Sequence, residues 1–438
     1  MKLSLIFIVL ASLFAEYSLG DSDYCPGYIK SSKLWDVFLG KPIAKVRLFT
    51  MKGDRLVEAP IQILPLSGRS DIRNKKVFAG GKREKLLSSY DRITMSRSSF
   101  SSRIRKETLL PCESKALQEI STAGKKPKYA YLALCKELRA SFLPEPVISY
   151  DSANTVKSEL FKFKHVPNNI MLFEEIALRG KGGRWYSAGS AGDLWLHLDV
   201  KSFFDINLNK SDLSADLQAR SKGAFGIVHQ LKFFIHILFF KIDLEMSTLF
   251  SFFEKSGHVP MKIDVPVNAW TRLNPGSGIL LHWNPGDTRY LDTKSRYAIP
   301  EVAKNRIMKG YLESGKLVKK HCRYGHCRFD LNSRTKDRFL RIQVSIPEKN
   351  ARRGLVPQYV PDAEVFVKEM GWDAAPRFKS KRIGIFFDNT GLAKGLHDLT
   401  YWFYPVDDPY DISGCPARFG VGQKIGNSQI SPSGPSIK

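Results

Sequence analysis

Six cysteines constrain this chain more than any other feature, because the residues before them predict an oxidising compartment. Residues 1–20 contain one basic residue, Lys2, followed by an apolar run over 3–15 and the small residue Gly20. This is the pattern of a cleaved secretory signal peptide. The apolar run is too short to span a bilayer stably. We therefore expect a secreted protein with no transmembrane segment once the signal peptide has been removed.

An even number of cysteines in such a compartment indicates disulfides, and six cysteines allow fifteen complete pairings. One local pair encloses a loop of about 23 residues, whose closure is worth about 3 kcal/mol in the chain-entropy model. A second pair flanks Gly325, which permits a tight reversal of the chain. The remaining two cysteines would then join the ends of the mature chain. The expected bridges are Cys112–Cys135, Cys322–Cys327 and Cys25–Cys415.

Zinc binding is the alternative use of the second pair, because His321 and His326 each stand directly before a cysteine. Structural zinc sites usually take a ligand pair from each of two separated segments. All four candidate ligands here fall within one short stretch. Disulfide formation is therefore the preferred interpretation, and we expect neither a metal nor another cofactor.

Composition and length predict an α+β protein dominated by antiparallel β-sheet of the sandwich kind, supported by disulfides and a few helices. The chain has 438 residues, of which 43% are hydrophobic and 12% aromatic, enough for two or three domains with sizeable cores. The expected organisation is a signal peptide (1–20), an N-terminal region (21–150) with a basic, Ser-rich insertion (68–106), a β-rich region (151–421) and a disordered tail (422–438).

Two helices are expected within this organisation. Tyr131, Cys135, Leu138 and Phe142 recur at helical spacing, which predicts a helix over 129–143. A second helix is expected over 300–314, opened by a proline and ended by a glycine.

Strands are expected wherever apolar residues alternate or cluster between turn residues. Two Asn-Pro-Gly turns, at 274–276 and 284–286, separate three such segments and predict an antiparallel meander. In the segment 193–200, His197 and Asp199 alternate with leucines, and we expect them to form cross-strand hydrogen bonds. The other expected strands are 44–51, 59–66, 339–346, 363–368, 382–388 and 399–406.

Positive charge is concentrated in two segments of a chain whose formal net charge is +25. Each of 69–106 and 304–341 has twelve Lys or Arg against three acidic residues, a net of +9. Such a field attracts polyanions, although a basic surface that only maintains solubility has the same composition. The candidate anion-binding residues are Lys75, Lys76, Lys82, Arg83, Lys85, Arg103, Arg105, Lys106, Lys316, Lys319, Lys320 and Arg323.

The expected partners follow from this charge and from secretion. They are an anionic glycan, an anionic membrane surface or a host protein, whereas secretion disfavours nucleic acid. Asn209-Lys210-Ser211 is a glycosylation sequon, so Asn209 is a candidate modified residue. The glycine-rich stretch 180–192 is expected to form a turn or lid, with Trp185 and Tyr186 as contact aromatics.

No compact catalytic motif occurs in the sequence, and this favours a non-enzymatic binding or effector protein. A hydrolase acting on polysaccharide is the first alternative and would need two carboxyl groups about 5 Å or about 6.5–9.5 Å apart. A structural surface protein is the second alternative. The carboxylates considered for a hydrolase are Glu174, Glu175, Asp407, Asp408 and Asp411.

Residues 241–302 resemble the FAINT modules of secreted piroplasm (Theileria and Babesia) proteins. The resemblance lies in an apolar-Asp-apolar start, an aromatic residue, a glycine-containing turn, a strand that ends in Trp and a final Val. It implies a small β-rich module in a protein exported towards a host cell, without catalytic residues. The matching positions are Ile242-Asp243-Leu244, Phe250, Trp270, Gly278, Trp283 and Val302.

Overall fold

The computed structural model shows a chain of antiparallel β-sheets, which confirms the expected fold class. Only the short pair formed by β1 (Gly20–Asp21) and β27 (Ser413–Gly414) is a parallel pairing of two described strands. The structure describes residues 20–21, 25–66, 85–104, 112–122, 127–137, 148–151, 154–202, 205–209, 211–237, 240–265, 267–292, 299, 301–302, 322–323, 326–372, 381–411, 413–415 and 420–425.

The chain divides into two compact units, and the first contains both ends of the chain. Unit 1 comprises 1–68, 79–144 and 412–438. It contains a five-stranded sheet in the order β28-β7-β8-β3-β4 and a three-stranded sheet in the order β2-β6-β5. Their bounds are β2 (Gly27–Lys30), β3 (Val46–Lys52), β4 (Arg55–Ala59), β5 (Ile61–Leu64), β6 (Arg92–Met95), β7 (Ser114–Ser121), β8 (Tyr129–Cys135) and β28 (Gly420–Ile425).

The helix expected over 129–143 is wrong, because Tyr129–Cys135 is the central strand β8. Strand β8 pairs with both β3 and β7. Its alternate residues enter two different hydrophobic clusters, Leu132 on one side and Tyr131 on the other. A strand that is buried on both faces has apolar residues at every position, so its sequence also satisfies a helical spacing. Residues 138–143 of the expected helix lie outside the described residues.

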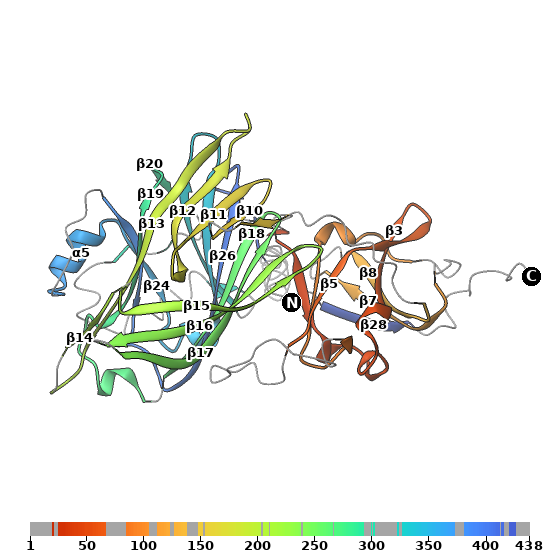
Figure 1. Cartoon of the computed structure of the whole chain (residues 1–438), viewed down its shortest axis with the longest axis horizontal. Helices are drawn as coiled ribbons and strands as arrows, with labels where there is room; N and C mark the ends of the chain where they lie inside the picture. Colours follow the sequence, from red (N-terminus) through yellow and green to blue (C-terminus); the bar gives the residue numbers. More distant parts are fainter. Residues whose placement is uncertain are drawn as a thin grey trace, which may run out of the picture. The chain divides into compact units, whose positions relative to one another are not determined.

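Unit 2 comprises 69–78 and 145–411 and contains two nine-stranded sheets. The first, sheet F, has the order β24-β25-β19-β13-β12-β11-β10-β9, with β14 paired to β13 (Figure 1). Its strands are β9 (Ser149–Tyr150), β10 (Thr155–Lys157), β11 (Phe161–Val166), β12 (Asn169–Arg179), β13 (Trp185–Asp199), β14 (Asp205–Leu208), β19 (Gly278–Pro285), β24 (Pro357–Val360) and β25 (Ile383–Asp388).

The second, sheet H, has the order β15-β16-β17-β18-β26-β23-β22-β20, with β21 paired to β22. Its strands are β15 (Leu213–Lys222), β16 (Gly226–Ile237), β17 (Phe240–Phe253), β18 (Ser256–Val265), β20 (Asp287–Asp292), β21 (Cys322–Arg323), β22 (His326–Arg334), β23 (Phe339–Pro347) and β26 (Gly395–Val406).

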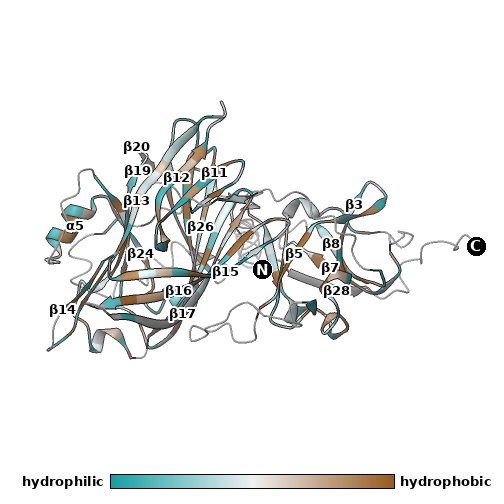
Figure 2. Cartoon of the chain, in the orientation of Figure 1, coloured by the Kyte–Doolittle hydropathy of each residue, from teal (hydrophilic) through white to brown (hydrophobic). Residues whose placement is uncertain are grey.

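The core of unit 2 lies between its two sheets. Phe163 of β11 and Phe250 of β17 meet edge to face at 5.5 Å, and Phe161 stacks on Phe252 at 6.4 Å. Hydrophobic and hydrophilic residues alternate along many of the strands (Figure 2). In β23, for example, Leu340 and Ile342 face this core. Such alternation is what a two-layer antiparallel sandwich requires.

The meander expected from the two Asn-Pro-Gly turns is wrong. Strand β18 pairs with β17 and β26 in sheet H, whereas β19 pairs with β13 and β25 in sheet F. The first turn lies on the path from sheet H to sheet F. Gly276 has a φ of +98° there, so the glycine is required, but the turn does not join paired strands.

The strand expected over 363–368 is also wrong, because Ala363–Glu369 forms the helix α5. The carboxylate of Asp362 accepts hydrogen bonds from the backbone N–H groups of Glu364 and Val365, which caps the helix. Phe366 and Val367 then pack with Trp195 of sheet F. The remaining described helical segments are η1 (Ser31–Lys33), η2 (Asp36–Phe38), η3 (Ile43–Lys45), η5 (Arg97–Ser99), η6 (Ala269–Thr271) and α4 (Glu348–Ala351).

All three expected disulfides are present: Cys25–Cys415, Cys112–Cys135 and Cys322–Cys327. The third closes the β21–β22 hairpin, where its two cysteines are register partners. The zinc interpretation of the same pair is therefore wrong. Among the described residues, no group of three or more His, Cys, Asp or Glu side chains is arranged to hold a metal ion.

The expected disordered tail is wrong over its first residues, because β28 (Gly420–Ile425) pairs with β7. Residues 426–438 and most of the helix expected over 300–314 lie outside the described residues. In the described part of the chain, no helix has the length and apolar character needed to cross a membrane.

Candidate anion-binding hairpin

Two of the twelve candidate anion-binding side chains are described, and both are exposed: Lys85 and Arg103. Arg103 donates to the buried Glu119 at 2.9 Å. This hydrogen bond and the charge of Glu119 raise the pKa of Arg103. Arg103 is therefore committed to an internal ion pair. The remaining ten candidates lie outside the described side chains, and these are Lys75, Lys76, Lys82, Arg83, Arg105, Lys106, Lys316, Lys319, Lys320 and Arg323.

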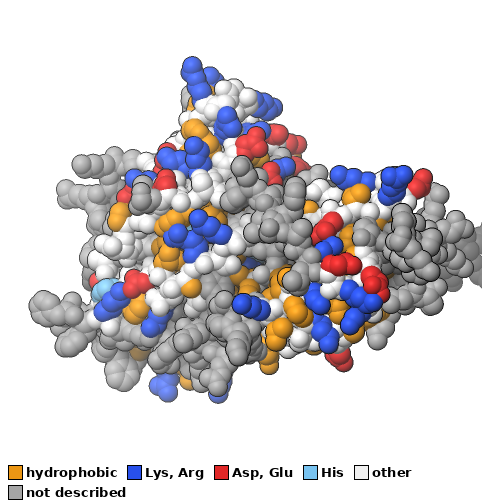
Figure 3. All heavy atoms as spheres, turned by 45° about the vertical axis from the view of Figure 1, so that its right-hand side comes forward, with side chains coloured by type: hydrophobic (Ala, Val, Ile, Leu, Met, Phe, Trp, Pro, Cys, Tyr) orange, Lys and Arg blue, Asp and Glu red, His pale blue; other side chains and the backbone are white. Residues whose placement is uncertain are grey.

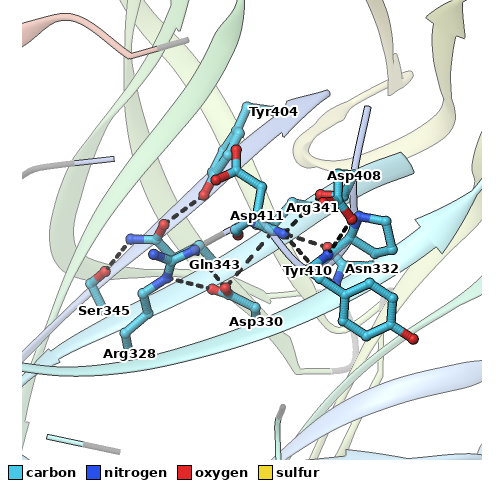
Figure 4. A network of polar contacts seen from close by, with 11 residues as sticks. Arg328, Asp330, Asn332, Arg341, Gln343, Ser345, Tyr404, Asp408, Tyr410 and Asp411 are labelled. Carbon is cyan, nitrogen blue, oxygen red and sulfur yellow. Dashed lines mark hydrogen bonds and ion pairs between the residues drawn. The ribbon is translucent and has the colours of Figure 1, made fainter. Parts of the chain in front are cut away.

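In the second basic segment, Arg328 and Arg341 do not contribute to the surface charge. Their side chains lie in a buried polar network on sheet H (Figure 4). Arg328 makes two hydrogen bonds to the carboxylate of Asp330, at 2.9 and 2.6 Å. Arg341 donates to Asn332 at 3.0 Å and to the backbone carbonyls of Pro409 and Asp411, both at 2.7 Å. A buried charge is tolerated only with such partners. These two arginines therefore have a structural role.

The same network continues to Tyr404, whose hydroxyl donates to Gln343 at 2.7 Å. Gln343 in turn donates to Ser345 at 2.8 Å. Burial raises the pKa of Tyr404 to about 12. The phenol therefore remains a neutral hydrogen-bond donor at any physiological pH.

An exposed cluster of cations lies instead at the hairpin that joins β12 and β13. The turn sequence is Gly-Lys-Gly-Gly-Arg over 180–184. The N–H of Gly180 donates to the carbonyl of Arg184 at 2.8 Å, and the N–H of Gly183 donates to the carbonyl of Gly180 at 2.9 Å. Gly183 has a φ of +79°, which favours glycine at this position. The two strands run to the top of the view in Figure 1, where this turn joins them.

Arg179, Lys181 and Arg184 are all exposed at this turn. None of them forms an ion pair with a described residue. Lys and Arg side chains gather at the protruding end of unit 2 at the top of Figure 3. We call Arg179, Lys181, Arg184, Trp185 and Tyr186 the hairpin tip.

Further along β12, two glutamates neutralise lysines of the neighbouring strand β11. Lys162 pairs with Glu175 at 3.0 Å, and Lys164 pairs with Glu174 at 2.5 Å. The hairpin tip therefore differs from the rest of this surface, because its three cations form no ion pair with a described residue, although the Asp337 carboxylate lies beside Gly180.

Two half-buried aromatic residues, Trp185 and Tyr186, follow the cations directly. The ammonium of Lys157 lies 5.8 Å from the centroid of the Trp185 ring, within cation–π range. The Tyr186 ring lies against Gly180, where an added Cβ would be 2.7 Å from it and 2.5 Å from the Asp337 carboxylate. Gly180 therefore allows the ring to pack closely across the turn.

The base of the hairpin is fixed by Arg338. This residue donates to the carbonyl of Arg179 at 3.1 Å and pairs with Asp407 at 3.1 Å. Arg338 thus links the first residue of the hairpin tip to the turn between β22 and β23.

Sequence reasoning selected Trp185 and Tyr186 but missed the three cations beside them. The turn lies outside both basic segments, and its charge is too small to stand out in a count over a long window. The sequence feature that could have identified these cations is the complete absence of Asp and Glu between Glu175 and Asp193.

Four of the five carboxylates considered for a hydrolase have structural partners, and the fifth residue, Asp411, takes part through its backbone carbonyl. Glu174 and Glu175 are in the lysine pairs above, Asp407 pairs with Arg338, and Asp408 accepts from the N–H of Tyr410 at 2.8 Å. The carbonyl of Asp411 accepts from Arg341. A small cavity between the two sheets is lined mainly by phenylalanine and aliphatic residues and has no carboxylate.

Other residues singled out in the sequence also have local roles. His197 Nδ1 lies 2.6 Å from the Asn207 amide oxygen, which is the expected cross-strand hydrogen bond. Asp199 accepts from the side-chain amide of Asn274 at 2.8 Å. Asn209 is exposed, and its amide oxygen accepts from the Ser211 hydroxyl at 2.6 Å. Its glycosylation stays a prediction.

No family model matches this chain, and no curated protein does either. The solved structures that resemble it include an alpha-mannosidase and a protein of glycosyl hydrolase family 38, both from Enterococcus faecalis. The identity is 9% and the TM-scores are 0.36 and 0.31, over 87% of this chain in each case. The chain spans 41% and 46% of the length of those proteins. At this level the likeness supports no assignment of activity.

Proposed function

We propose that this protein is a secreted, non-enzymatic binding protein that attaches to polyanionic surfaces. The observation that supports the proposal is the hairpin tip, where Arg179, Lys181 and Arg184 are exposed and lack carboxylate partners among the described residues. Unpaired cations on a protruding element retain their full attraction for an anionic surface, whereas paired cations are already neutralised. The formal net charge of +25 adds a long-range attraction of the same sign.

Chromatography on heparin tests this proposal. The wild-type protein should be retained at about 50 mM salt and eluted as the Debye length shortens with added salt. The triple variant Arg179→Gln/Lys181→Gln/Arg184→Gln should elute at markedly lower salt. A matched control, Lys222→Gln/Lys349→Gln/Lys368→Gln, removes the same charge from exposed positions elsewhere in unit 2.

The comparison between the two triple variants is decisive. If both elute at the same salt, net charge rather than the hairpin tip governs retention, and the site is wrong. If the wild-type protein passes through the column without retention, the function itself is wrong.

A further inference from the structure

We infer that the polyanionic surface recognised by the hairpin tip is an anionic lipid bilayer, which Trp185 and Tyr186 contact at the level of the headgroups. This inference rests on the proposed function and adds the identity of the partner. The alternatives, a sulfated glycan and an acidic protein, are treated as outcomes of the test.

The shape of the site is the first argument. The hairpin tip is convex, because β12 and β13 end in a turn at the protruding end of unit 2 (Figures 1 and 3). Ligands of limited size are usually held in concave sites that enclose them. A convex tip instead makes its widest contact with an extended, nearly flat surface.

The composition of the tip is the second argument. Three cations and two amphipathic aromatics occupy eight consecutive positions, 179–186, without a single acidic residue. Trp and Tyr are enriched where hydrocarbon meets lipid headgroups, because one part of each ring is apolar and the other can hydrogen-bond. Lys and Arg beside them bind the anionic headgroups, at about 1 kcal/mol for each residue near the surface.

The local backbone is the third argument. Gly182 has no heavy atom within 4 Å of the position of an added Cβ, so the end of the turn is narrow and open. Trp185 is register partner to Arg179 at the first pair of the hairpin. Trp185 and Arg179 therefore lie side by side at the same level of the hairpin, and the tip can bring a ring and its cations to the headgroup region together.

A fluorescent label at the tip tests the inference directly. Gly182→Cys places a thiol in open space, and the six native cysteines are all in disulfides. The variant is labelled with an environment-sensitive dye and mixed with vesicles of phosphatidylcholine containing about 30% phosphatidylserine, whose surface attracts basic residues. We expect a blue shift of the dye and quenching by a lipid-attached quencher. The same dye at Lys368→Cys, on the exposed face of α5, should not respond.

Co-sedimentation with the same vesicles gives the second measurement. The triple variant of the hairpin tip should bind about a hundred-fold more weakly than wild type, because three basic contacts of about 1 kcal/mol are lost. The matched triple control should bind nearly as well as wild type, and vesicles of phosphatidylcholine alone should bind neither protein.

The outcomes separate this inference from the proposed function. Retention on heparin without binding to the anionic vesicles overturns the lipid inference and leaves polyanion binding in place. Vesicle binding with a silent label at position 182 also overturns the inference, because another surface is then in contact. If the wild-type protein binds neither heparin nor the anionic vesicles, both proposals are wrong.

Discussion

Two buried histidines, His165 of β11 and His229 of β16, link the stability of unit 2 to pH. Both are fully buried, and their rings lie 5.9 Å apart among Phe250, Phe252 and Tyr150. Burial lowers the pKa of His165 to about 3. Burial, with smaller contributions from His165 and Arg220, lowers that of His229 to about 3.

These pKa values predict that acid destabilises unit 2. The unfolded chain gains a proton at each histidine below pH 6.5, whereas the folded chain resists protonation until about pH 3. The stabilisation that comes from keeping the two histidines neutral is therefore complete above pH 6.5. It is lost progressively as the pH falls from 6.5 towards 3. At pH 5 the loss is about 2 kcal/mol for each histidine. Thermal unfolding measured between pH 7.5 and 5 should show this decline.

A double variant distinguishes the histidines from other acid-sensitive groups. His165→Leu/His229→Leu should remove most of the dependence on pH over this range, whatever its effect on stability at pH 7.5. His326→Gln, at an exposed position, should leave the dependence unchanged. A double variant with the same slope as wild type would contradict the assignment.

At the same scale, the sequence shows which residues are charged but not which charges reach the surface. Arg328 and Arg341 contribute to the count that marked 304–341 as a binding segment, yet both are buried beside Asp330. The partners of Arg341 include backbone carbonyls of residues about seventy positions away. Such long-range contacts leave no pattern in the local sequence.

Among the elements, α5 shows how a capping residue decides between helix and strand. The segment 363–368 is short and apolar enough to satisfy a strand pattern, which is why the sequence predicts a strand there. Asp362 stands directly before it and supplies the hydrogen bonds that the first helical N–H groups need. The capping signal was therefore present in the sequence, and the apolar pattern outweighed it.

We predict that Asp362→Ala destabilises unit 2 by about 1 kcal/mol, because two backbone N–H groups at the helix start lose their acceptor. Chemical denaturation monitored by fluorescence measures this change. Asp362→Ser, which keeps a capping oxygen, should restore most of the stability. If both variants lost the same free energy of unfolding, the stabilisation by the Asp362 carboxylate would not come from the capping hydrogen bonds.

Local turn chemistry marks where some strands end. The Lys52-Gly53-Asp54 turn ends β3, and Gly53 has a positive φ of +60° there. The turn leads into β4, whereas the strand expected over 59–66 contains β5 of the other sheet. At the end of β25, Asp388 accepts from the N–H of Thr390 at 2.9 Å. Strand pairing was not predictable in the same way, because β18 and β19 are neighbours in the sequence and belong to different sheets.

At the scale of the whole molecule, the topology joins the beginning and the end of the chain in one unit. Strand β28 pairs with β7, and Cys25 is bonded to Cys415 across 390 positions. The disulfide itself could be inferred by elimination from the other two pairs. The strand beyond it could not, because its Gly-rich sequence resembles a disordered tail.

This closure predicts that the two units lose structure independently when the long-range bridge is removed. A bridge across so long a segment restricts the unfolded chain by about 5–6 kcal/mol in the chain-entropy model. Cys25→Ser/Cys415→Ser should therefore destabilise unit 1, whereas the core of unit 2 needs neither end of the chain. Hydrogen exchange should show faster exchange in β2, β7 and β28, with β23 and β26 still protected. Equal loss of protection in both units would mean that the molecule unfolds as one cooperative body, and the division into units would then describe contacts but not stability.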